Sequence, residues 1–234
     1  MNLIKDIRLF ESNKPNEPGY GLPSYIGELY ALEVKNCLEV IYRLMFLLRH
    51  RGFSLGEFDH LYLNFTTQLP HGELLASNRI DSYHTWYRYV DAGCDVQTFN
   101  SWTLSQKNDF VIATIRRAIG LFTDSEGAKI VDDSFDAVLR YGAELAIPYK
   151  EKQGDPYTVR VLVKITDDLD FIPVVRIYDG DALICEEILP PYSRDPFILQ
   201  FGTITVGKKA VRITPRKSYE AEYYELKPIK IEIK

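Results

Sequence analysis

Residues 151–156 read EKQGDP, and the hydrophobic pattern of the chain changes at this point. Before it, apolar residues recur at the 3.6-residue spacing of amphipathic helices. After it, they alternate with polar residues, as in half-buried strands. Helices gathered ahead of a set of strands favour the α+β class over a doubly wound parallel sheet. We therefore predict a mixed helix and strand region over 1–150 and an antiparallel β region over 151–234, as two domains or as one.

The N-terminal region is expected to hold about three helices. The first runs from an N-cap at Ser24 to Arg51, with Gly52 ending it in the left-handed conformation. The second is capped by Ser105, and the third starts near Ser125. Short strands are predicted over 2–10, 60–66 and 83–90, with loops over 13–23 and 70–82.

The C-terminal region is expected to form a meander of about five or six antiparallel strands. Asp179-Gly180 is a pair favoured in two-residue hairpin turns, and it separates two of these strands. The predicted strands cover residues 157–166, 171–178, 182–189, 197–206, 210–214 and 219–233.

Composition limits the classes of function. The 234 residues carry a net charge of −5, which argues against a general binder of nucleic acid or of anionic membranes. Three cysteines occur without any CxxC pair, and free thiols fit a reducing compartment. The N-terminus lacks the apolar core of a signal peptide. We expect a cytoplasmic protein without a cofactor.

One motif resembles a catalytic one. Residues 52–56 read GFSLG, which matches the G-x-S-x-G nucleophile elbow. That elbow needs a strand before the serine and a helix after it. Here a predicted helix precedes Ser54 and a predicted strand follows it. We therefore predict that Ser54 is not a nucleophile.

Three of the four histidines fall close together, at His60, His71 and His84, with carboxylates nearby in sequence. Such groups bind zinc or iron, and an open site of this kind would be catalytic. No H-x-H or H-x-x-x-H spacing brings two of them onto one face of an element. We predict no bound metal, and an enzyme with a cryptic site of histidines and carboxylates stays open as an alternative.

Residues 57–95 are the best candidate for a binding surface. They contain six acidic and two basic side chains, a local net charge of −4, together with five Tyr and Trp residues. Alternation along 83–90 would leave either Tyr83, Tyr87 and Tyr89 or else His84, Trp86 and Arg88 outside. The predicted contact residues are Asp59, Glu73, Asp81, Trp86, Tyr87 and Asp91. A second charge run, 208–217, has five basic residues and no acid, and such runs are solvated faces or polar interfaces.

In overall character, an acidic and aromatic-rich α+β chain without a catalytic signature resembles bacterial toxin-neutralising (immunity) proteins. The resemblance implies a non-enzymatic protein that binds a basic toxin domain by charge complementarity. A self-assembling structural subunit is the third hypothesis. Neither nucleic acid nor a membrane is an expected partner, and the sequence leaves the oligomeric state open.

Overall fold

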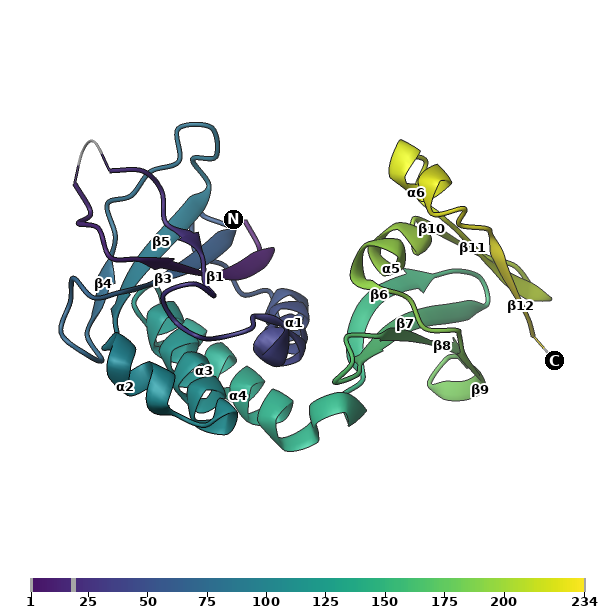
Figure 1. Cartoon of the computed structure of the whole chain (residues 1–234). Coiled ribbons are helices and arrows are strands. Elements are labelled where there is room, and N and C mark those ends of the chain that lie inside the picture. Colours follow the sequence, from purple (N-terminus) through teal and green to yellow (C-terminus); the bar gives the residue numbers. More distant parts are fainter. Residues whose placement is uncertain (1, 18–19, 234) are drawn as a thin grey trace. The chain divides into compact units, whose positions relative to one another are not determined.

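The computed structural model describes residues 2–17 and 20–233, so Pro18 and Gly19 of the predicted loop 13–23 lie outside the described residues. The chain forms two compact units, Met1–Arg140 and Tyr141–Lys234 (Figure 1). The fold class is α+β, as predicted: a mixed five-stranded sheet with helices comes first, and antiparallel sheets of four and three strands follow. The placement of a domain boundary at residue 150 stays a prediction.

The N-terminal sheet has the strand order β2-β1-β3-β5-β4. Its three central strands, β1, β3 and β5, run parallel, while β2 and β4 pair antiparallel at the two edges. The sequence predicted no parallel pairing, and the pairing arises because long connections, one with α1 and one with β4, return the chain to the same end of the sheet. The strand bounds are Asp6–Ser12 (β1), Ser24–Tyr25 (β2), His60–Thr66 (β3), Leu74–Ala76 (β4) and Tyr87–Gly93 (β5).

The two faces of this sheet differ in chemistry. One face carries aliphatic residues, such as the cross-strand row Leu9, Leu63 and Val90, and helices pack on this side (Figure 1). The other face carries aromatic and polar residues, such as the row Arg8, Tyr62 and Tyr89, and loops cover it. The helices are α1 (Lys35–His50), α2 (Val96–Ser101), α3 (Leu104–Gly120) and α4 (Ser125–Tyr141).

The prediction of a helix beginning at Ser24 is wrong, since α1 begins at Lys35. The cause is Glu11, a buried residue at the end of β1. Its carboxylate accepts hydrogen bonds from four successive backbone N–H groups, those of Gly27, Glu28, Leu29 and Tyr30, at 2.8–3.1 Å. The apolar period of residues 26–34 is helical, but these charge-assisted bonds hold the segment in another conformation. Gly27 has φ +143°, a backbone conformation that residues with a side chain rarely adopt.

The strand predicted over 83–90 is also partly wrong, because β5 begins only at Tyr87. The Asp81 carboxylate accepts hydrogen bonds from the N–H groups of Tyr83 (2.9 Å) and His84 (3.1 Å). This local bonding competes with strand pairing and keeps residues 81–86 in a turn. Strand alternation therefore does not apply before Tyr87.

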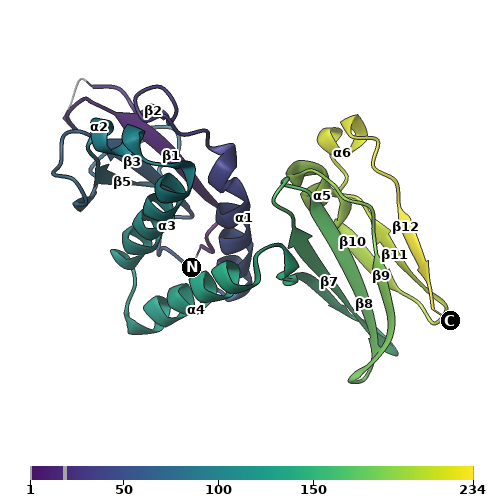
Figure 2. The same ribbon diagram turned by 60° about the horizontal axis from the view of Figure 1, so that its bottom comes forward.

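The C-terminal unit contains two antiparallel sheets (Figure 2). The first sheet is a meander in chain order. It starts with β6 (Ile147–Gln153), a strand that was not predicted from the sequence. Residues 151–153 of the predicted break therefore belong to β6, and residues 154–156 form the turn to β7. The other strands of this sheet are β7 (Tyr157–Ile165), β8 (Phe171–Asp179) and β9 (Ala182–Ile188). The second sheet has the order β10-β11-β12, with bounds Thr203–Val206, Ala210–Thr214 and Ile229–Glu232.

Two segments predicted as strand are partly helical. Helix α5 spans Arg194–Gln200, and α6 spans Tyr219–Tyr223. Phe197 and Phe201 from α5 and its end are buried, and Phe197 packs against Tyr149 and Phe171 of the meander. The apolar residues that suggested a strand are thus part of the hydrophobic core, but they lie on a helix and at its end.

Replacing Glu11 by Gln should destabilise the N-terminal unit. The amide keeps one acceptor oxygen. Its NH2 group replaces the second oxygen and faces two backbone N–H donors, which lose their acceptor. We expect a loss of about 2–4 kcal/mol in the free energy of unfolding. Urea denaturation followed by circular dichroism measures it. Glu28→Gln, at an exposed side chain of the same segment, is the control, and an equal effect of both variants would contradict the role given to Glu11.

Candidate functional site

The aromatic face of the N-terminal sheet holds a packed cluster of rings. Phe10, Tyr62 and Tyr89 are buried, and half-buried Tyr87 packs against them. Ring centroids lie 5.0 Å apart for Phe10–Tyr62 and 4.5 Å for Tyr62–Tyr87. Burial raises the pKa of Tyr89 to about 12, and burial also raises the pKa of Tyr62. Both phenols are therefore protonated at neutral pH. The ring cluster is uncharged, and it supports residues 80–87, whose His84 ring stacks on Tyr87.

Residues 80–87, which we call the aromatic loop, extend from this cluster to the surface. Three large side chains of the loop are exposed: Ile80 (75%), Tyr83 (86%) and Trp86 (41%). Exposed aromatics grouped on one loop are the residue types that dominate binding energy in protein interfaces. The predicted strand would have exposed only one of Tyr83 and Trp86. Both are exposed, because they precede β5 and do not alternate as strand residues do.

Several contacts hold the aromatic loop in place. Besides the two backbone bonds already described, the second Asp81 oxygen lies 3.0 Å from Nδ1 of His84. The His84 ring stacks on Tyr87, with centroids 4.7 Å apart and planes 8° apart, and packs edge-to-face on Trp86. The small burial of the Asp81 carboxyl would raise its pKa, but the His84 contact and the two N–H donors outweigh this and lower it. Asp81 is thus ionised at neutral pH and acts as the anchor of the loop.

A second carboxylate lies beneath the loop. Asp59 is buried, its Oδ2 lies 2.6 Å from Nζ of Lys5, and its Oδ1 contacts Nδ1 of His60. Burial acts to raise the pKa of Asp59, while Lys5 and His60 lower it more strongly. The Asp59 N–H donates to the carbonyl of Trp86 at 3.2 Å, which ties the start of β3 to the aromatic loop.

Asp91 is buried on the aromatic face of the sheet, two residues after Tyr89 on β5. Its Oδ1 accepts from Nδ2 of Asn64 at 2.6 Å and lies 3.4 Å from Nε of Arg79. Arg79 also donates to the carbonyl of Lys14 at 3.3 Å. This network joins β3 and β5 to the loops before β2 and β5.

The structure thus separates the predicted contact residues into two groups. Asp81, Trp86 and Tyr87 come together in the aromatic loop. Asp59 and Asp91 are buried and paired with cations, and Glu73, although exposed, lies beside β4 near the other end of β5. Asp59 pairs with Lys5, and Asp91 pairs with Arg79, which the net charge of −4 already includes, so neither carboxylate is displayed on a surface.

The histidines also separate. His60 and His84 both pack on Tyr87, whereas His71 stacks on Phe110 with centroids 5.3 Å apart. Within residues 2–17 and 20–233, no three His, Cys, Asp or Glu side chains gather in a way that suits a metal ion. Ser54 lies in a turn after α1, where its Oγ accepts from the Gly56 N–H at 3.1 Å.

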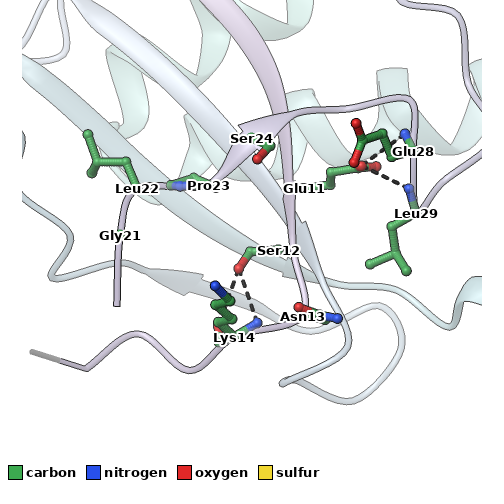
Figure 3. Close-up of a pocket in the computed structure, with 10 residues that line it drawn as sticks. All are labelled: Glu11, Ser12, Asn13, Lys14, Gly21, Leu22, Pro23, Ser24, Glu28 and Leu29. Carbon is green, nitrogen blue, oxygen red and sulfur yellow. Dashed lines mark hydrogen bonds between the residues drawn. The ribbon is translucent and has the colours of Figure 1, made fainter. Parts of the chain in front are cut away.

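A polar cavity of about 360 Å³ lies at the carboxyl end of β1 (Figure 3). Glu11 lines it, but the four backbone N–H groups already occupy both oxygens of its carboxylate. The Ser12 hydroxyl accepts from the Lys14 N–H at 3.1 Å. These groups support the loop around the cavity, so we assign it a structural role.

Sequence reasoning missed Ile80 and the anchoring role of Asp81. The signal was present in residues 81–84, which read DSYH, because Asp followed by small and polar residues is typical of a side-chain-capped turn. The alternating aromatics from Tyr83 onward favoured a strand and concealed it.

Comparisons with models of protein families, with curated proteins and with solved structures gave no match for this chain. No helix in the described ranges has the length and apolarity needed to cross a membrane.

Replacing Asp59 by Asn should lower the free energy of unfolding by about 2–3 kcal/mol at pH 7, because Lys5 and His60 lose their buried anion. The folded pKa of Asp59 lies below its ordinary value of 3.8. Its contribution is therefore complete above about pH 5 and is lost as the pH falls through the folded pKa. Urea titrations at pH 7 and pH 3 should show the difference between variant and wild type shrinking in acid.

Asp133→Asn is the control for this prediction. Asp133 forms an ion pair with Lys129 at 2.8 Å, but both side chains are more than half exposed. Exposed pairs stabilise little, so this variant should stay close to wild type at both pH values. A constant deficit of the Asp59 variant from pH 7 to pH 3 would show that its ionisation does not matter.

Proposed function

We propose that this is a non-enzymatic protein-binding protein and that the aromatic loop is the centre of its contact surface. The observation that carries the proposal is the combination of exposure and order in that loop. Ile80, Tyr83 and Trp86 are exposed, while Asp81 and His84 fix the backbone between them. A contact surface that is ordered before binding loses less conformational entropy on association.

The charges near the loop favour a partner with a basic rim. Glu57 is exposed just before β3, and Asp81, although its carboxylate is held within the loop, adds negative charge beneath the exposed side chains. The buried Asp59 is a fixed part of the support and is not offered to a partner. Charge of this kind speeds association, while the aromatic anchors supply most of the affinity.

A toxin-neutralising role with a basic toxin domain as partner is the specific form of this proposal. It draws on the resemblance in composition and on the net charge of −5. The proposal places the protein in the cytoplasm, where its three thiols would stay reduced.

The test is a comparison of tagged variants in a pull-down from the native host. Wild type should capture a discrete partner, and Tyr83→Ala with Trp86→Ala should reduce its recovery at least tenfold, since two interface aromatics are each worth about 1–2 kcal/mol or more. Both side chains are exposed, so the melting temperature should hardly change. Quantitative mass spectrometry of the eluates measures the recovery.

Tyr219→Ala with Tyr223→Ala is the matched control, because these exposed tyrosines lie on α6 of the other unit. The control variant should capture the same partner at wild-type levels. Equal recovery of the partner by all three proteins would exclude the aromatic loop from the interface.

A further inference from the structure

The outward face of the sheet formed by β10, β11 and β12 carries a row with two cations, Arg212 and Lys230, and of the two only Lys230 has a carboxylate partner among the described residues, Glu232. Ile204, Val211, Ile213 and Ile231 are buried on the inner face. The outer side carries exposed polar residues, and its central cross-strand row consists of Thr205, Arg212 and Lys230 in register. Arg212 and Lys230 are thus direct neighbours on adjacent strands. Like charges directly opposite each other destabilise a sheet.

The other sheet of the same unit shows how this fold neutralises such a pair. Arg160 and Arg176 are also directly opposite, but Glu151 and Glu186 flank them in the same row. Arg160 lies 2.7 Å from Glu151, and Arg176 lies 2.6 Å from Glu186. Every cation of that row therefore has its own carboxylate.

The row of Arg212 is compensated only in part. Among the described residues, no carboxylate pairs with Arg212, and Lys230 contacts only Glu232 of its own strand, at 2.9 Å. The turn before β11 adds two exposed lysines, and the segment after it adds two more exposed cations. These six residues, which we call the basic face, are Lys208, Lys209, Arg212, Arg216, Lys217 and Lys230.

We propose that the basic face binds an acidic polypeptide segment, whose carboxylates complete the row as Glu151 and Glu186 complete the other. The hydroxyls of Thr203 and Thr205 lie exposed beside the cations and can donate further hydrogen bonds to such a segment. This surface is separate from the aromatic loop and needs no partner there.

Nucleic acid fits the same face less well. Binding of single strands uses exposed aromatics for stacking, and the outward residues of these three strands include none, since the exposed Tyr219 and Tyr223 lie on α6. Reading a duplex groove takes a protruding helix or ribbon, whereas this surface is a sheet face.

The test uses poly-L-glutamate of defined length, labelled for fluorescence anisotropy, at about 50 mM salt, where screening is weak. Wild type should bind it, and Arg212→Gln with Lys230→Gln should weaken binding about tenfold or more. The control, Arg160→Gln with Arg176→Gln, removes the same two charges from the compensated row and should change affinity less than about threefold. A duplex DNA of equal charge should bind more weakly than the polypeptide.

Thermal unfolding gives a second readout that needs no ligand. Arg212 faces Lys230 and forms no ion pair among the described residues, so Arg212→Gln relieves repulsion and should melt at or above the wild-type temperature. Arg176→Gln breaks an ion pair and should not gain stability. Absence of polyglutamate binding by wild type, equal losses in both double variants, or tighter binding of DNA would each overturn the proposal. None of these outcomes bears on the aromatic loop, which the pull-down tests separately.

Discussion

The N-terminal unit depends on one buried carboxylate, that of Glu11. A buried carboxylate is tolerated only when hydrogen-bond donors match its oxygens, and here four backbone N–H groups supply them. The same segment is held from other elements as well. Asn100 of α2 and Lys107 of α3 bond to the backbone of residues 29 and 31, and the Tyr30 hydroxyl donates to the carbonyl of Cys94 after β5. Glu11 therefore fixes the point where strands, helices and loop meet.

This constraint has a consequence for the other face of the sheet. Because residues 27–30 are fastened to β1, the chain before them is restricted to a course over the aromatic face, where Ser24–Tyr25 pair with β1 and Tyr25 stacks on Phe10 at 4.8 Å. The loops on that face cover Asn64, Asp91 and Arg79, which is why polar residues there are buried. Tyr25 itself stays 59% exposed, so this face presents Tyr25 and the aromatic loop to solvent.

The hydrophobic periodicity predicted the fold class correctly, but it did not predict two element boundaries or the pairing of charged side chains. Helix α4 and strands β3, β7, β8 and β11 lie where the pattern placed them, since their apolar spacing and their tertiary surroundings agree. Helix α3 is also present, but the prediction of Ser105 as its N-cap is wrong, because Thr103 caps it and forms a capping box with Gln106. The missed boundaries at Lys35 and Tyr87 share one cause: an acidic side chain, Glu11 or Asp81, takes up the backbone N–H groups that a regular element would have used. Glu11 is distant in sequence from its donors, so no local pattern signals it, whereas Asp81 is a local signal that was outweighed.

The candidate site shows the same limit for charge. A count over residues 57–95 treats every carboxylate as available, but the fold buries Asp59 beside Lys5 and Asp91 beside Arg79, and a count of charges does not show which carboxylates are buried. The basic run 208–217 behaves in the opposite way. It remains exposed because the register of β11 sets Arg212 beside Thr205 and Lys230, and no acid enters the row. The charge that a sequence offers to a partner is thus what remains after the sheet register has paired its own ions, and for this chain that remainder is basic on the second sheet of the C-terminal unit.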